Sequence, residues 1–218
     1  MKTLDKAVVC DDQPIGNRTA ATMFHEARFL SSWIDPKSLE VQDAYKSITS
    51  GFNRFENKVV ACWDFVKRIP YHPFVPSRVT VGGVSYSQDD AWLDPGQTLR
   101  VGYLNCFNKS ILLASLLRQE FPPEDIYVCL GNVQSDGIGG HAFLYLATGD
   151  YIMECTDPKL RLPFIKAEEA DIYESVIFFN DEYTFCIPGA TLTMPLGACC
   201  VRWLEDYISA RHCHNYIA

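Results

Sequence analysis

The chain has no long hydrophobic run, no excess of positive charge and no low-complexity segment. No stretch approaches the roughly 20 consecutive apolar residues that span a bilayer, so no membrane-spanning helix is predicted. Lys and Arg number 19 against 27 Asp and Glu, which gives a formal net charge of −8. Nucleic-acid binders need clustered Lys and Arg to contact the phosphates. We therefore expect neither a membrane nor a nucleic acid among the partners.

The first residues also lack the apolar core of a secretory signal peptide, because the stretch Ala7–Cys10 is too short. This favours a soluble, cytoplasmic protein. The nine cysteines are an odd number, and several lie in apolar runs, where a free thiol behaves as a small hydrophobic residue. Without a secretory signal, a disulfide framework is the weaker interpretation.

Core-forming residues are plentiful, since 48% of the chain is hydrophobic and 13% is aromatic. That supply fits one large domain rather than a disordered chain. We predict a single domain over residues 1–218 with its core at about 53–190. A helical extension is expected before the core, with a plausible helix around Thr19–Ser31, and a helix over Trp203–Ala210 after it.

Two helices are predicted in the first half of the core. Apolar residues recur at three- and four-residue steps after Asn53, which marks one buried helix face that ends before Pro70. A second helix, rich in Leu, Ile and Ala, is expected over Asn105–Gln119. Between them, residues 72–96 hold several Pro, Gly and Ser and are predicted to form a long surface connection.

After residue 125 the hydrophobic period changes to two, which predicts strands. The expected strands are Ile126–Leu130, His141–Ala147, Tyr151–Thr156, Ser175–Phe179 and Thr184–Ile187. Thr148–Asp150 and Asn180-Asp181 are typical of hairpin turns. Helices followed by an antiparallel sheet indicate an α+β fold.

Cys106 occupies a position that favours chemistry at its thiol. Asn105 is a good N-cap, so Cys106 would lie in the first turn of the second helix. The positive end of the helix dipole and the unpaired N–H groups there favour the thiolate. The backbone N–H of Cys106 could also serve as an oxyanion donor.

A nucleophilic cysteine needs a base and a group that orients the base. His141 follows the glycine-containing run 135–140 and is expected to open its strand, where it could face a cleft. Glu154 and Asp157 are the candidate carboxylates. They differ by an odd number of residues, so both cannot point to the same face of a regular strand.

Between Val59 and Asp157 the chain resembles the transglutaminase-like family. Val59–Tyr71 is similar to the family's upstream helix, and Thr98–Cys106 to the approach to its nucleophile. Ser110–Arg118 is similar to the rest of the nucleophile's helix, including a Leu-Leu-Arg ending. Gly140–Phe143 matches the family's Gly-His-Ala-Trp element with Phe in place of Trp. The resemblance implies a papain-like core, in which a nucleophile-bearing helix packs on an antiparallel sheet.

The resemblance implies a Cys-His-Asp type triad with Cys106 as nucleophile and His141 as general base. The chain departs from the family at the acid, where members usually show Asp-Pro-Thr. Tyr151–Thr156 keeps the strand and the Thr but has Glu154 and a Cys, whereas Asp157 keeps the Asp-Pro pair. Glu154 is preferred, because a short hairpin after the histidine strand keeps its side chain facing His141.

Papain-like enzymes often use a Gln or Trp side chain upstream of the cysteine as the second oxyanion donor, and Gln97 and Trp92 are the candidates. The expected activity is cysteine-dependent acyl transfer on amide bonds of a peptide or protein substrate, with hydrolysis as the default. Amine transfer is the other outcome of the same acyl-thioester, and no cofactor is needed.

Two alternatives remain at this point. The chain could keep the fold as a non-catalytic binding or structural module. It could instead bind a metal near its C-terminus through Cys199, Cys200 and His212–His214, although their spacing fits no standard zinc pattern.

Overall fold

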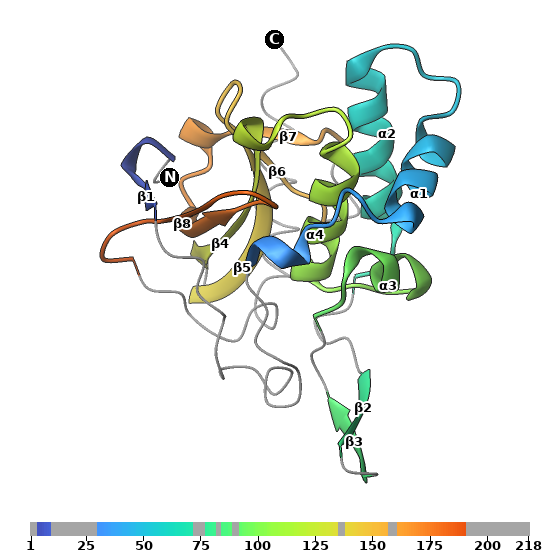
Figure 1. The fold of residues 1–218 in the computed structure, drawn as a ribbon. Coiled ribbons are helices and arrows are strands. Elements are labelled where there is room, and N and C mark those ends of the chain that lie inside the picture. The colour runs from blue at the N-terminus through green and yellow to red at the C-terminus, as the bar shows by residue number, and fades with distance from the viewer. Residues whose placement is uncertain are drawn as a thin grey trace.

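The computed structural model describes residues 4–9, 30–71, 77–81, 84–88, 92–134, 138–156 and 161–190. Helices and a seven-stranded antiparallel sheet form two layers, which confirms the α+β prediction (Figure 1). The α-helices are α1 (Leu39–Thr49), α2 (Phe55–Arg68), α3 (Pro95–Arg100) and α4 (Cys106–Leu117). Short 3-10 turns cover Leu4–Lys6, Leu30–Trp33, Pro123–Asp125 and Ala167–Glu169.

The sheet has the strand order β1-β9-β8-β4-β5-β6-β7, and every neighbouring pair is antiparallel. Its strands are β1 (Val8–Val9), β4 (Ile126–Gln134), β5 (Ile138–Leu146), β6 (Tyr151–Met153), β7 (Phe164–Lys166), β8 (Tyr173–Phe179) and β9 (Thr184–Cys186). Five of these were predicted. The two edge strands β1 and β7 were missed, because two or three residues carry no readable alternation.

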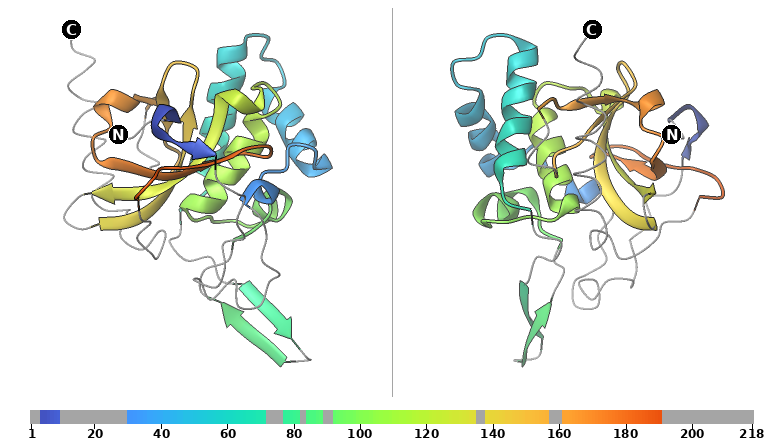
Figure 2. Two further views of the ribbon diagram at one scale, coloured as in Figure 1. Left: turned by 60° about the vertical axis from the view of Figure 1, so that its left-hand side comes forward. Right: turned by 180° about the vertical axis from the view of Figure 1, so that it is seen from behind.

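Helix α4 is the central element of the helical layer. It contacts β4 and β5 on one side and α1, α2 and α3 on the other, and the views in Figures 1 and 2 show it between the sheet and α2. All twelve of its residues are buried. A helix that is buried on every side lies within a core, which explains its Leu- and Ile-rich sequence.

The predicted helix after Asn53 is α2, and its buried face is Val59, Cys62, Trp63 and Val66. It ends at Arg68, two residues before Pro70, as expected from the restriction that proline places on its predecessor. Helix α1 was not predicted. Only Val41 and Thr49 are buried in it, so its sequence offers too little apolar periodicity to mark a helix.

The turn between β5 and β6 is the predicted Thr148–Asp150 hairpin. Gly149 has φ +93° and Asp150 has φ +56°, values that Gly and Asp tolerate better than other residues. The turn sets the register so that Leu144 lies opposite Met153 and Leu146 opposite Tyr151.

The expectation that His141 opens its strand is wrong. Strand β5 begins at Ile138, and His141 pairs with Gly131 in the adjacent β4. The glycines of the 135–140 run do not end the strand because β4 supplies a full set of pairing partners. At Gly131 a Cβ would lie 2.3 Å from the backbone oxygen of Glu174 in β8, so only glycine allows β8 to approach here. The pairing with β8 changes register at this point.

The predicted surface connection over residues 72–96 contains regular structure that was not predicted from the sequence. Strands β2 (Ser77–Val81) and β3 (Val84–Gln88) pair as a hairpin that lies apart from both layers (Figure 1), and α3 begins at Pro95. The sequence carried the signal, because Gly82-Gly83 separates two alternating segments in the manner of a two-residue hairpin loop.

The structure describes only part of what was predicted at the two ends of the chain. Residues 19–29 of the expected helix, all of Trp203–Ala210 and the C-terminal cysteine and histidine cluster lie outside the described residues. Within the described ranges, no helix is both long and apolar enough to cross a membrane.

Candidate active site

The structure brings His141 of β5 and Glu154 together in the core. His141 Nε2 lies 2.7 Å from Glu154 Oε2, and both side chains have 0% exposure. The register explains the meeting. Leu144 lies opposite Met153, so Glu154, the next residue, faces the same side of the sheet as Phe143 and His141.

Glu154 has hydrogen-bond donors on both carboxylate oxygens. Oε1 accepts from the backbone N–H groups of Cys155 and Thr156, each at 2.8 Å, and from Thr156 Oγ1 at 2.5 Å. Oε2 accepts from Tyr173 Oη at 3.3 Å and faces the His141 ring. A buried carboxylate needs this many partners to remain ionised.

Burial alone would raise the pKa of Glu154. The His141 ring and the hydrogen bonds from Thr156 act in the opposite direction, and together they hold the pKa of this carboxyl below its ordinary value. Glu154 therefore carries a negative charge at neutral pH, next to the imidazole.

Cys106 is the first residue of α4, as predicted. The Asn105 side chain caps the helix by accepting from the Asn108 backbone N–H at 2.9 Å. Helix α4 packs on β5, so the helix that begins with the thiol lies against the strand that carries the imidazole. Cys106 and His141 both have 0% exposure. The sequence suggested that His141 could face a cleft, whereas in the structure its side chain has no exposed surface.

Three further cysteines, Cys62, Cys129 and Cys155, are free and fully buried. Burial raises the pKa of each to about 12, with Glu120 adding to the effect at Cys62 and Glu154 at Cys155. These thiols are protonated at neutral pH and are poor nucleophiles. Cys186 is disulfide-bonded. The sequence favoured free thiols and did not predict this bond.

The two oxyanion candidates have different surroundings. Gln97 is exposed and forms a capping box with Asp94 at the start of α3, so its side chain is committed to that helix end. Trp92 is only 7% exposed, and its ring stacks on Phe107, the neighbour of Cys106, with centroids 3.8 Å apart. Its buried Nε1 has no hydrogen-bond acceptor among the described residues.

Asp157, the second carboxylate candidate, lies outside the described residues. No group of three or more His, Cys, Asp or Glu side chains suited to a metal occurs within the part of the chain that the structure describes.

The sequence did not single out Thr156 and Tyr173, which donate to Glu154. The Thr of the Glu-Cys-Thr segment was noted only as a family match, and its hydroxyl was a usable signal. Tyr173 is nineteen positions from Glu154 along the chain, and its contact arises from the packing of the sheet, for which no local pattern exists.

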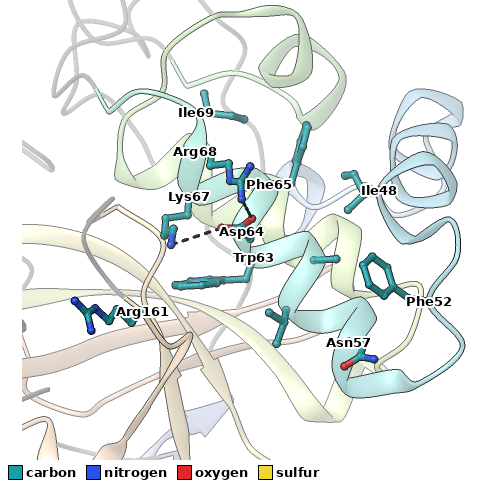
Figure 3. A pocket seen from close by; sticks show the side chains of 12 residues that line it. Ile48, Phe52, Asn57, Trp63, Asp64, Phe65, Lys67, Arg68, Ile69 and Arg161 are labelled. Atoms are coloured by element: carbon teal, nitrogen blue, oxygen red, sulfur yellow. Dashed lines mark ion pairs between the residues drawn. The ribbon is translucent and has the colours of Figure 1, made fainter.

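A surface pocket of about 880 Å³ lies over α2 and does not include the buried histidine and glutamate. Figure 3 shows Trp63 and Lys67 of α2 in its wall, with Arg161 beyond the Trp63 ring, away from the helix. The Trp63 ring is the point where this surface meets the interior, because its Nε1 donates to the backbone oxygen of Glu154 at 2.6 Å.

No family model and no curated protein matches the chain. Among solved structures, it is similar to LapG of Legionella pneumophila. The calcium-bound form aligns at 15% identity and a TM-score of 0.42, over 82% of this chain and 99% of that one. Two further LapG structures, one of them EGTA-treated, align at 15% identity with TM-scores of 0.44 and 0.41, over 79% of this chain and 97% of theirs. Likeness at this level carries no argument about activity, substrate or metal.

Replacing Glu154 by Gln should destabilise the protein by about 1–3 kcal/mol at pH near 5.5, because an amide cannot accept every hydrogen bond that the carboxylate receives. The folded-state pKa of Glu154 is depressed, so its stabilising effect is present above the ordinary Glu value of about 4.3 and is lost as pH falls through the lower folded value. Urea denaturation should therefore show that the difference in the free energy of unfolding between wild type and Glu154→Gln becomes smaller as the pH falls from about 5.5 to 3.

Glu168→Gln is the matched control, since the Glu168 side chain is 73% exposed. If the loss of stability in Glu154→Gln stays constant over this pH range, the assignment of Glu154 as a buried, ionised partner of His141 is contradicted.

Proposed function

We propose that the chain is a cysteine-dependent acyl-transfer enzyme that acts on amide bonds of peptides or proteins. Cys106 is the nucleophile, His141 the general base and Glu154 the acid that orients His141. The observation that carries the proposal is the 2.7 Å contact between His141 Nε2 and Glu154 Oε2. Both side chains are fully buried, and β5, which carries His141, packs against the helix that begins at Cys106.

In the proposed reaction His141 takes the proton from the Cys106 thiol, and Sγ attacks the carbonyl carbon of the substrate amide. Because Glu154 faces Nε2, the nitrogen that receives the proton is Nδ1. Collapse of the tetrahedral intermediate breaks the C–N bond, and the imidazolium returns the proton to the leaving amine. The acyl-thioester is then hydrolysed by water, our default, or passed to an amine.

Glu154 acts without being protonated. It holds the imidazole in the tautomer with the proton on Nε2 and stabilises the imidazolium that forms when the thiol is deprotonated. Its donors at Cys155, Thr156 and Tyr173 keep the carboxylate in place during this change. Because the carboxylate is held in place, the His141 ring is already oriented for proton transfer before the substrate binds.

The full burial of Cys106 and His141 means that a substrate reaches them only when the arrangement opens. The same observation favours the second candidate function, a non-catalytic module that retains the pair as core residues. The two candidates differ in the reactivity of the Cys106 thiol, because an unactivated core cysteine reacts slowly.

Limited alkylation with iodoacetamide at neutral pH separates the two candidates. Cys62, Cys129 and Cys155 are internal controls, because they share the complete burial of Cys106. If Cys106 is activated by His141, it should be alkylated at least about 100-fold faster than these three, a general-base effect of ordinary size. In His141→Ala that advantage should disappear. Peptide mapping by mass spectrometry measures all four rates in one sample.

Equal rates for the four buried cysteines in the wild-type protein would overturn the enzyme proposal and leave the non-catalytic module. A Cys106 advantage that survives in His141→Ala would remove His141 as the base. Urea denaturation of the variant shows whether it remains folded in the assay.

The oxyanion donors proposed for the reaction are the backbone N–H of Cys106 and the indole Nε1 of Trp92. The support for Trp92 is its buried Nε1, for which the described residues supply no acceptor, and the stacking of its ring on Phe107, the residue after the nucleophile. A buried indole N–H normally finds an acceptor, and a substrate oxyanion is one.

Trp92→Phe should slow acylation of Cys106 by p-nitrophenyl acetate about 100-fold, the usual effect of losing one oxyanion donor. Its alkylation by iodoacetamide should be unchanged, because displacement at an sp³ carbon forms no oxyanion. Equal slowing of both reactions would show that Trp92 acts only through packing on Phe107.

A further inference from the structure

Lys109 is a fully buried lysine one helical turn after Cys106. Its Nζ donates to the backbone oxygens of Val66 at 3.1 Å, Lys67 at 3.0 Å and Cys155 at 3.2 Å. Only the protonated amine has three N–H donors, so three acceptors match the ammonium form. Burial lowers the pKa of this group, and the three acceptors are what makes a charged lysine tolerable here.

The three acceptors come from two different parts of the fold. Val66 and Lys67 are in the last turn of α2, at the negative end of the helix dipole, and the Val66 oxygen also accepts from the Ile69 backbone N–H at 3.2 Å. Cys155 follows Glu154 directly. Lys109 therefore links the nucleophile's helix to α2 and also to the segment that carries the acid.

Trp63 of α2 makes a second contact with the same segment. Its Nε1 donates to the Glu154 backbone oxygen at 2.6 Å, and its ring lies below the Lys67 ammonium at 4.2 Å. Two donors from two helices thus hold two consecutive carbonyls, those of Glu154 and Cys155.

These carbonyls belong to the peptide units whose N–H groups hold the carboxylate. The Glu154 carbonyl shares its peptide plane with the Cys155 N–H, and the Cys155 carbonyl shares its plane with the Thr156 N–H. Both N–H groups donate to Glu154 Oε1 at 2.8 Å. A trans peptide is planar, with C=O and N–H pointing in opposite directions. Each plane is therefore fixed at both ends, by a helix donor on one side and by the carboxylate on the other.

We infer that Lys109 and Trp63 are positioning residues that hold Glu154 toward His141 by fixing the two peptide planes on which its carboxylate rests. The inference rests on the proposed function, since it concerns the acid of that triad. A hydrogen bond to the carbonyl oxygen also polarises the peptide unit and strengthens the hydrogen bond that the N–H of the same unit donates. The Lys109 charge therefore adds to its geometric effect.

A purely structural lysine would link α4 to the last turn of α2 and would need only the Val66 and Lys67 carbonyls. The third contact, to Cys155, extends the link to the acid. The two roles differ in what is lost when Lys109 is replaced: general stability in one case, and the local hold on the Glu154 carboxylate in the other.

Residue-resolved amide hydrogen exchange tests the inference without any substrate. In Lys109→Met, exchange of the Thr156 amide should accelerate at least about 10-fold relative to amides of the β4–β5 pair. In Trp63→Phe, exchange of the Cys155 amide should accelerate more than that of the Thr156 amide. The substitution releases the Glu154 carbonyl, which belongs to the same peptide unit as the Cys155 N–H. Lys58→Met is the matched control, because Lys58 is also a paired lysine, bound to Glu120 at 2.7 Å, and makes no contact with residues 154–156 among the described interactions.

Alkylation of Cys106 between about pH 6 and 9 provides the second measurement. If the carboxylate is misplaced, the rate in Lys109→Met and Trp63→Phe should fall about 10- to 100-fold at neutral pH. At alkaline pH the variants should be alkylated as fast as the wild type, because hydroxide removes the thiol proton without His141. A loosened structure would instead speed alkylation of Cys62 and Cys129 at every pH.

Unchanged Cys155 and Thr156 exchange in both variants would overturn the inference, even if Cys106 proves reactive. An unreactive wild-type Cys106 would instead refute the proposed function, and the exchange result would still decide whether the peptide planes are held as described. If Lys109→Met does not fold, Trp63→Phe gives the same two readouts, because it leaves the buried ammonium and its acceptors in place.

Discussion

A carboxylate with no solvent contact has to be neutralised and hydrogen-bonded by the protein around it, and Glu154 imposes that requirement on the centre of this fold. His141 faces one oxygen, three donors from Cys155 and Thr156 reach the other, and Tyr173 adds a fourth. Leaving such a charge unpaired costs several kcal/mol. The short β5–β6 turn, the helix side chains that donate to the carbonyls of residues 154 and 155, and the hydroxyl of Tyr173 all act on this one group.

The arrangement places Cys106, His141 and Glu154 inside the core rather than in a surface cleft. Helix α4 is buried along its whole length, and its first residue is the cysteine proposed as nucleophile. In a site that excludes water, each charge interaction is stronger and the imidazole has fewer alternative partners. For the proposed reaction, this burial would make substrate access a step separate from the chemistry.

Part of the site could be predicted because it depends on local rules. The Asn105 cap and the Leu-rich run place Cys106 at the start of α4. The parity of the β5–β6 hairpin places Glu154 on the face of His141 once the turn length is known. Both follow from the helical and strand periods.

The rest depends on tertiary packing. Nothing near Lys109 shows that its ammonium would meet carbonyls 42 to 46 residues away along the chain, and a lysine in a helix is ordinarily solvated. The start of β5 at Ile138 depends on pairing with β4, which overrides the glycines before His141. The burial of α4 depends on its packing against α1, α2 and α3, and neither α1 nor α3 was predicted from the sequence.

In the proposed mechanism Glu154 holds His141 with its proton on Nε2, so that Nδ1 can take the thiol proton. The most direct measurement is ¹⁵N NMR of the His141 ring through a pH titration, in wild type and in Glu154→Gln. We expect neutral His141 to carry its proton on Nε2 in the wild type and to lose this preference in the variant. A wild-type ring protonated on Nδ1, or a tautomer that is unaffected by Glu154→Gln, would contradict the mechanism.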